Sequence, residues 1–310
     1  MGRITRFSTA LLALMLGGCT ALGPDYETPT VPTQDEWTEV ENPLVNAEGA
    51  LDPQWWQLAF ADPVLDELVE RALKNNLTLR SAGLRVLQSQ QQLAIAIGNQ
   101  YPQQQQISAN AQREQENGTR FNDYDVGFNL TWELDFWGRF QRQIESASAN
   151  LDTSVANYDE AMVSLVAQVA QSYLLLRTFQ DRLTIARENI KLQEESLRIA
   201  QAKLDAGDAS ELDVDQATSL LYSTRATVPA LEISLQQTKN ALALLLGESP
   251  QDFNKLAGNM GAIPTSTPAV ALGMPQDLIR QRPDVRAAER QLAAQSAQIG
   301  FAVTELYPCL

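Results

Sequence analysis

The stretch YDVGFNLTWEL, residues 124–134, alternates between apolar and polar side chains along its whole length. Its apolar members are Tyr124, Val126, Phe128, Leu130, Trp132 and Leu134. A period of two is typical of a β-strand with one apolar face, and the stretch is as long as the strands of about 9 to 11 residues that cross membranes. Alternation alone is equally compatible with a half-buried strand in a water-soluble sheet.

A weaker alternating run precedes this strand and predicts a hairpin over residues 103–134. Ile107, Ala109 and Ala111 alternate with polar residues, and Asn117-Gly118 marks a turn within an exposed loop expected over residues 113–122. A two-stranded hairpin is not stable alone, and a sheet in lipid must close into a barrel. Closure therefore requires strands from other copies, which we expect from a second half missing from this sequence and from other subunits.

Aromatic side chains gather at the end of the second strand, namely Trp132, Phe136 and Trp137. Aromatic girdles lie at the interfaces of membrane β-barrels, so these three are predicted membrane-interface residues. Together with the N-terminal sequence described below, they favour a membrane strand over the soluble alternative.

A helical stretch without proline or glycine follows, from about residue 140 to residue 204. Its apolar residues recur every three or four positions, as in an amphipathic helix. At 1.5 Å per residue the helix would be about 100 Å long, which predicts a coiled coil or rod rather than part of a compact domain. A return helix is expected over residues 211–246, with a kink or break at Pro229.

The two long helices are joined by a short tip, which consists of Ala206, Gly207, Asp208, Ala209 and Ser210. Gly207 suits the C-cap of the first helix. Ser210 can cap the second helix, with Asp213 three residues further on.

Residues 80–102 and 286–308 form an internal repeat at a spacing of 206 positions. The identical pairs are Arg80/Arg286, Ala82/Ala288, Gln92/Gln298, Ala96/Ala302, Tyr101/Tyr307 and Pro102/Pro308. Each copy is expected to be a helix that stops at Tyr-Pro, because proline cannot continue it. The first copy is followed by the hairpin and the rod and the second by two residues, so we expect a truncated product or a partial sequence.

The N-terminus predicts a secretory signal over residues 1–18, with Arg3 and Arg6 ahead of an apolar run too short to span a bilayer. The sequence LGGC, residues 16–19, resembles a bacterial lipobox, in which the Cys19 thiol is lipidated and becomes the mature N-terminus. The alternative is an ordinary signal peptide that happens to contain a cysteine. Acyl chains contribute about 0.8 kcal/mol per buried CH₂, so several chains anchor firmly. By resemblance to other lipoproteins, Thr20 favours the outer membrane.

Composition excludes several classes of function. The 310-residue chain has 23 basic and 38 acidic residues and a net charge of −15, which suits neither DNA nor RNA binding. It has no histidine, which removes Ser-His-Asp and Cys-His sites and the commonest metal ligand. No catalytic, metal or cofactor site is predicted, and without a nucleophile motif an envelope hydrolase is poorly supported. The acidity suits solubility, or a lumen that favours cations.

The ordered motifs of the mature chain resemble the outer membrane efflux protein family, TolC-like, in the lipoprotein branch that serves resistance-nodulation-division (RND) exporters. The residues that carry the resemblance include Cys19, Gly23-Pro24-Asp25-Tyr26, Trp55-Trp56, Asp62-Pro63, Tyr101-Pro102, Trp132 to Arg139, Gly207, Leu212-Asp213-Val214, Leu245-Leu246-Gly247, Ile263-Pro264 and Arg282-Pro283-Asp284. Cys309 is not expected in that family.

This resemblance implies an α+β membrane protein. A long α-helical coiled-coil hairpin would form part of a periplasmic α-barrel, and a transmembrane β-hairpin would contribute to a trimeric β-barrel. It further implies a homotrimer, contact of the tip at residues 206–210 with a periplasmic adaptor (membrane fusion) protein, and an inner-membrane RND transporter as the source of energy.

The expected function is a passive exit duct for drugs or other small molecules. The protein would be lipid-anchored in the outer membrane and extend into the periplasm. The alternative is a periplasmic coiled-coil adaptor or scaffold lipoprotein without channel activity.

The expected organisation has seven parts. They are a signal peptide (1–18), an extended N-terminal tail (19–62), a first-repeat helix (63–102), a transmembrane β-hairpin (103–134), a long helical hairpin (135–250), a linker (251–275) and the truncated start of a second repeat (276–310).

Overall fold

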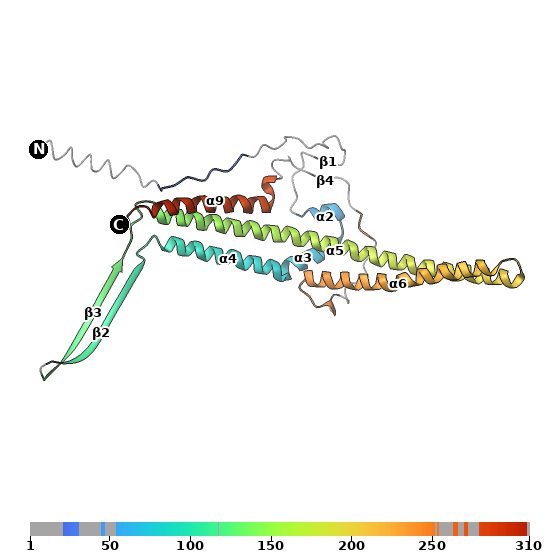
Figure 1. Ribbon diagram of the computed structural model, residues 1–310, viewed down its shortest axis with the longest axis horizontal. Coiled ribbons are helices and arrows are strands. Elements are labelled where there is room, and N and C mark those ends of the chain that lie inside the picture. The colour runs from blue at the N-terminus through green and yellow to red at the C-terminus, as the bar shows by residue number, and fades with distance from the viewer. Residues whose placement is uncertain are drawn as a thin grey trace. The chain divides into compact units, whose positions relative to one another are not determined.

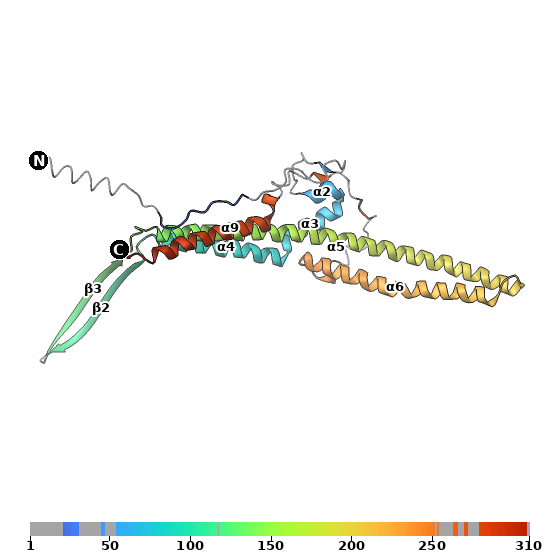
Figure 2. The same ribbon diagram turned by 45° about the horizontal axis from the view of Figure 1, so that its top comes forward.

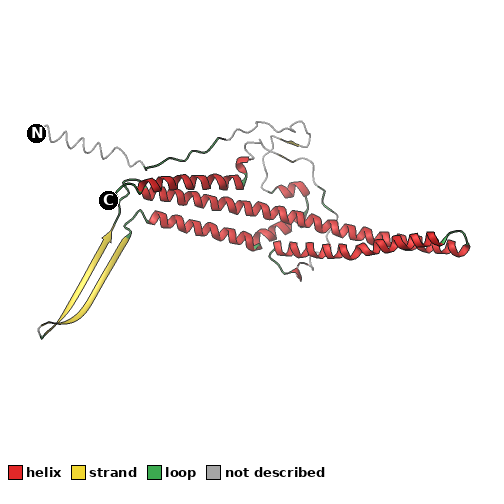
Figure 3. Cartoon of the chain, viewed as in Figure 1, coloured by secondary structure: helices red, strands yellow, loops and turns green. Residues whose placement is uncertain are grey.

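The computed structural model describes residues 21–30, 45–46, 54–116, 118–251, 253, 263–265, 270–271 and 279–308 (Figure 1). Cys19, Asn117, Cys309, the predicted signal peptide and most of the predicted linker lie outside these residues. Most of the described chain is helical (Figure 3). Its contacts define two units, the first from residues 1–32, 82–158 and 280–310 and the second from residues 33–81 and 159–279.

The first unit is built on three helices, which are α4 (Leu77–Gly98), α9 (Pro283–Thr304) and the first part of α5 (Arg139–Ala206). Both α4 and α9 contact α5 through small polar side chains. Ser89 of α4 and Ser154 of α5 share a hydrogen bond of 2.7 Å, and Gln298 of α9 donates to Ser146 of α5 at 2.8 Å.

Helices α4 and α9 are the two copies of the repeat, and they are equivalent along their whole length. Their first residues are 206 positions apart, and so are their last. The turns that follow are also alike, because the amide of Tyr101 donates to the carbonyl of Gly98 and that of Tyr307 to Thr304, both at 3.1 Å. Each helix thus ends in a tight turn just before Tyr-Pro, as the repeat predicts to within three residues.

The predicted β-hairpin is confirmed, with different bounds. Strands β2 (Gln104–Glu116) and β3 (Thr119–Thr131) pair in antiparallel register over their full length. The exposed loop predicted over residues 113–122 is therefore wrong, since pairing continues until only residues 117 and 118 separate the strands. Cross-strand polar contacts stabilise this end, such as the 3.1 Å hydrogen bond from Arg120 Nε to Gln115 Oε1. Gly118 adopts a φ of +83°, which suits glycine in a tight turn.

The second unit contains α2 (Trp55–Phe60), α3 (Pro63–Asn75), the rest of α5, α6 (Glu211–Leu245) and a short parallel pair, β1 (Val45–Asn46) with β4 (Val270–Ala271). Its fully buried side chains include Leu65, Leu68, Val69, Tyr173, Leu176, Leu242, Leu246 and Phe253. The hydroxyl of Tyr173 on α5 donates to the carboxylate of Asp62 at 2.8 Å. The same carboxylate caps the first turn of α3, so one residue begins that helix and ties it to α5.

Helix α5 runs for 68 residues, close to the length expected, and α6 lies beside its C-terminal half (Figures 1 and 2). The break predicted at Pro229 is wrong, because α6 is one helix from end to end with this proline inside it. A proline removes one backbone hydrogen bond. Arg225 and Glu232, on either side of the proline, form ion pairs with Glu194 and Arg187 of α5, so α6 stays beside α5 along this stretch.

The single first-repeat helix predicted over residues 63–102 is divided in two at Asn76. Its amide donates to Ala72 at the end of α3, and its side-chain oxygen accepts from the amide of Leu79, at 2.9 Å, in the first turn of α4. Its side-chain amide also donates to the carbonyl of Leu245 at the end of α6, at 2.9 Å. One buried asparagine thus joins the ends of three helices.

Replacing Asn76 with alanine should destabilise the fold by about 1–3 kcal/mol, because it removes a helix cap and leaves the Leu245 carbonyl unpaired. Guanidinium unfolding followed by helical circular dichroism measures the loss. Asn150→Ala, on the exposed side of α5, should be neutral or slightly stabilising. Equal midpoints for the two variants would contradict this role of Asn76.

Candidate functional site

The β-hairpin has one apolar face. Directly paired residues share a face of a sheet, and the register places Ile107, Ala109 and Ala111 opposite Phe128, Val126 and Tyr124. Leu130 extends the same face. These side chains are open to solvent in the isolated chain, with Val126 79% and Ile107 78% exposed.

The other face of the hairpin is polar. It carries Gln106, Ser108, Asn110 and Gln112 on β2 and Asn129, Gly127, Asp125 and Asp123 on β3. Among the described residues, neither strand pairs with any other strand. A two-stranded ribbon of this kind suits a boundary between an apolar and an aqueous medium, and its two edges are open to pairing with further strands.

The three predicted interface aromatics lie at the base of the hairpin, just after β3 ends at Thr131. Trp132 and Phe136 are about half exposed, at 51% and 49%. Trp137 instead packs on Tyr307 with ring centres 4.9 Å apart, and its indole N–H donates to the carbonyl of Pro308 at 3.1 Å. The structure therefore brings the second Tyr-Pro of the repeat to one of these aromatics.

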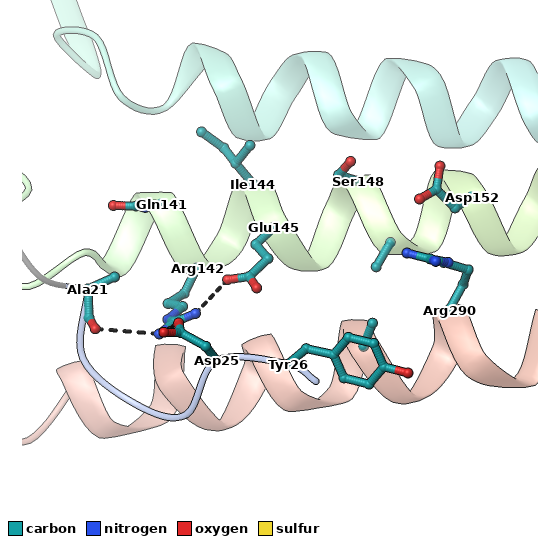
Figure 4. A pocket seen from close by; sticks show the side chains of 12 residues that line it. Ala21, Asp25, Tyr26, Gln141, Arg142, Ile144, Glu145, Ser148, Asp152 and Arg290 are labelled. Carbon is teal, nitrogen blue, oxygen red and sulfur yellow. Dashed lines mark hydrogen bonds and ion pairs between the residues drawn. The ribbon is translucent and has the colours of Figure 1, made fainter. Parts of the chain in front are cut away.

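Close to this base, the N-terminal tail is held by a buried arginine (Figure 4). Arg142 on α5 is 3% exposed. It donates to the carbonyls of Leu22, at 2.9 Å, and Gly23, at 3.1 Å, and to the carboxylates of Asp25, at 2.8 Å, and Glu145, at 2.7 Å. The side chain lies beside an open groove of about 750 Å³. We use the name tail seat for Arg142 together with the parts of α5 and α9 that lie against the tail.

The electrostatics of the tail seat keep Arg142 charged. Burial opposes the charge, but hydrogen bonds to Glu145 and Asp25 outweigh burial and raise the pKa of Arg142 above its ordinary value. Sequence reasoning missed this residue. The signal that could have found it is an arginine in helical register with the small buried residues Ser146 and Ala149.

The predicted tip of the helical hairpin is an exposed turn closed by two local motifs. Gly207 has a φ of +78°. Its amide donates to Leu204 at 2.9 Å and the next amide, of Asp208, to Lys203 at 2.8 Å, which is a Schellman C-cap. As predicted, Ser210 then caps α6.

Ser210 and Asp213 form a reciprocal capping box. The Ser210 hydroxyl accepts from the amide of Asp213, whose carboxylate accepts from the Ser210 amide at 2.9 Å and its hydroxyl at 2.8 Å. The backbone and side-chain hydrogen bonds from Ser210 lower the pKa of Asp213. The tip is thus closed by hydrogen bonds to residues within a few positions of it, at the end of α5 and the start of α6.

Within the described ranges, no cluster of three or more histidine, cysteine, aspartate or glutamate side chains could hold a metal ion. No described helix is long and apolar enough to cross a membrane. Of the predicted site residues, the structure describes the tip and the aromatics, whereas Cys19 lies outside the described residues.

The chain contains both a β-hairpin with one apolar face and a long helical hairpin, a combination that suits a subunit of a membrane channel. The model of the outer membrane efflux protein family matches residues 68–248, and the chain belongs to that family. Members of this family are channels rather than enzymes.

Among its relatives, the chain is 33% identical over 306 residues to nodulation protein T of Rhizobium leguminosarum bv. viciae, covering 98% of this chain and 63% of that protein. It is 30% identical over 303 residues to the cation efflux system protein CusC of Escherichia coli K12, covering 96% and 65%. The solved outer-membrane channel OprN superimposes with a TM-score of 0.83 at 34% identity, covering 93% of this chain and 65% of that one. The chain thus spans just under two thirds of the length of these proteins.

The capping box predicts a pH effect at the tip. A lowered pKa means that Asp213 stays ionised, and helps to hold the start of α6, at every pH above the ordinary aspartate pKa; the contribution is lost as pH falls through the lowered value. Carbon-13 NMR titration should therefore find the pKa of Asp213 below that of a model aspartate. Ser210→Ala should raise it part of the way, because the backbone amide still donates, and Ser234→Ala in mid-α6 should not. An unchanged pKa in Ser210→Ala would contradict the box.

Proposed function

We propose that this chain is an outer-membrane channel component of a tripartite efflux pump. It acts as a passive exit duct for drugs or other small molecules, and no residue carries out covalent chemistry. The energy comes from an inner-membrane RND transporter. Relatives support this proposal, since they include the toluene efflux pump outer membrane protein TtgF of Pseudomonas putida, which is 32% identical over 325 residues.

The observation that carries the proposal is the one-sided β-hairpin. Three apolar cross-strand pairs in a row, with Leu130 next to them, face one side, and polar residues face the other. In a water-soluble sheet the apolar face would be buried on a core, yet Phe128 is 67% and Tyr124 72% exposed. A strand pair in a barrel wall needs this pattern, with lipid outside and water inside.

The repeat supports assembly into a closed homotrimeric tube. Helix α9 buries Ala293 and Ala294 against Ala149 of α5. The equivalent positions of α4, 206 residues earlier, are Leu87 and Gln88, and both are exposed. Helix α9 thus uses one face to pack on α5, and the equivalent face of α4 is exposed.

The converse holds for α9. Ser89 of α4 bonds to α5, whereas its equivalent Gln295 is exposed. Ala96 of α4 is buried at 4% exposure, and its equivalent Ala302 is exposed. Helices α4 and α9 therefore pack on α5 through different faces, and each leaves exposed the face that the other buries. Both exposed faces would be covered in a ring in which each of these short helices lies between two long helices. Further copies of the subunit supply that ring.

The helical hairpin is suited to bridge the periplasm and to meet a periplasmic adaptor protein at its tip, residues 206–210. Exposed apolar residues recur every seventh position on α5, at Ile185, Leu192 and Ile199, as in a helix that packs side by side with others. A lipid anchor at Cys19 would hold the protein in the outer membrane, with Trp132, Phe136 and Trp137 at the membrane interface.

A periplasmic coiled-coil adaptor or scaffold lipoprotein is the second candidate. It shares the anchor and the helical hairpin. It gives no role to the apolar face of β2 and β3, which is why the channel is favoured.

Substitutions in two adjacent cross-strand pairs, one on each face of the hairpin, distinguish the channel from the adaptor or scaffold. Val126→Arg places a charge on the apolar face and should cost roughly 2–4 kcal/mol if that face meets lipid, so the heat-modifiable form in outer-membrane fractions should be lost. Asn110→Arg, on the polar face one position from Ala109 (the partner of Val126), should assemble normally. If both variants assemble and support efflux equally, the hairpin does not face lipid and the adaptor or scaffold is favoured.

Contact of the tip with an adaptor can be tested with a bulky side chain. Asp208→Trp leaves the backbone of the turn possible but blocks close approach, so crosslinking to the adaptor and drug resistance should both fall several-fold. Glu188→Trp, exposed on α5 well before the tip, should leave both unchanged. Unaltered crosslinking in Asp208→Trp would remove the tip from the interface.

A further inference from the structure

Three glycines lie where the tail and its seat come too close together for a side chain. They are Gly23 in the tail, Gly138 just before α5, and Gly300 in α9. A Cβ on Gly23, which has a φ of +94°, would collide with the backbone of Gly300 on α9. A Cβ on Gly138 would lie 2.5 Å from Ala21, and one on Gly300 would lie 2.8 Å from both Arg142 Nε and the carbonyl oxygen of Leu22. The seat is therefore shaped to the tail backbone itself.

Gly300 differs from its counterpart in the repeat. The equivalent residue of α4 is Ala94, which is exposed. A glycine in a helix interior is unfavourable by roughly 0.5–1 kcal/mol relative to alanine. The glycine thus occurs in α9, which contacts the tail, and is replaced by alanine in α4.

The tail makes further contacts on either side of Arg142. The amide of Leu22 donates to the carbonyl of Trp137 at 3.1 Å, just after the hairpin. Tyr26 packs on the alanine cluster shared by α5 and α9, and the hydroxyl of Thr28 donates to Glu289 of α9 at 3.2 Å. Covalent geometry keeps Cys19 within about 7 Å of Ala21, because two residues separate their Cα atoms at most that far.

We propose that Arg142 and Gly300 lock the N-terminal tail onto α5 and α9, so that the membrane anchor is fixed beside the base of the β-hairpin. Arg142 is the positioning residue, since one planar guanidinium with several fixed donors holds carbonyls and a carboxylate at once. Gly300 gives the tail backbone room to reach it. The anchoring consequence rests on the proposed lipidation of Cys19; the lock itself does not.

The experiment measures local opening of the tail in the detergent-solubilised full chain. Endoprotease Glu-C cleaves after Glu27 only when the tail leaves its seat, so the cleavage rate follows the population of the open tail. Arg142→Gln removes the guanidinium, and Arg142→Lys keeps a charge that cannot reach all the acceptors. Gly300→Ala obstructs the seat without changing any charge.

We expect cleavage after Glu27 to be at least tenfold faster in Arg142→Gln and Gly300→Ala than in the wild type, with Arg142→Lys between. The controls are Gly98→Ala, where a Cβ meets no atom within 4 Å, and Arg85→Gln, which removes an exposed arginine of α4. Both should match the wild type. The thermal midpoint of the helical signal should be unchanged throughout, because the lock acts locally.

Equal cleavage rates in wild type and Arg142→Gln would overturn the lock, whether both are fast or both slow. A fall in the thermal midpoint that accounts for faster cleavage would also overturn it, in favour of a general stabilising role. Palmitate labelling of the same samples tests the anchor separately. A wild type without label but with the predicted cleavage pattern would reject lipidation of Cys19 and leave the lock intact.

Discussion

Packing along α5 supports the rest of both units. Isolated helices are marginal in water, and most helical stability in proteins comes from a face packed against neighbours. The partners of α5 change along its length, from α4 and α9 in the first unit to α6 and the start of α3 in the second. Its contacts change accordingly, from small residues such as Ser146, through the large buried Leu176, to exposed ion pairs such as Arg187–Glu232.

Features with a local period or a local cap could be predicted from the sequence. The alternation at Tyr124 to Leu130 gave the apolar face of β3, and the uninterrupted helical pattern gave the length of α5. Gly207 and Ser210 predicted the closed tip because both caps are made by residues within a few positions of each other. The repeat predicted that α4 and α9 are equivalent helices, which their matching bounds confirm.

The remaining features depend on residues far apart in the chain. Asn76 divides one predicted helix because the end of α6 offers it a carbonyl 169 positions away. Pro229 lies inside a continuous α6, which has contacts with α5 on both sides of the proline that the local sequence does not reveal. Arg142 looks like any surface arginine until the tail and α9 cover it. The pairing of the β-hairpin next to its turn was also missed, since the polar residues there leave no apolar period to read.

The unequal use of α4 and α9 has a consequence for the symmetry of the assembly. Two helices of the same length and register occupy environments that are similar but not the same, a situation known as quasi-equivalence. Where the tail crosses α9 the backbone leaves room only for a glycine, at Gly300, whereas α4 keeps Ala94 at the equivalent position. A perfectly symmetric ring would have no place that distinguishes one short helix from the next. The tail distinguishes the two helices, because only α9 has the glycine that the backbone of residues 22 and 23 requires.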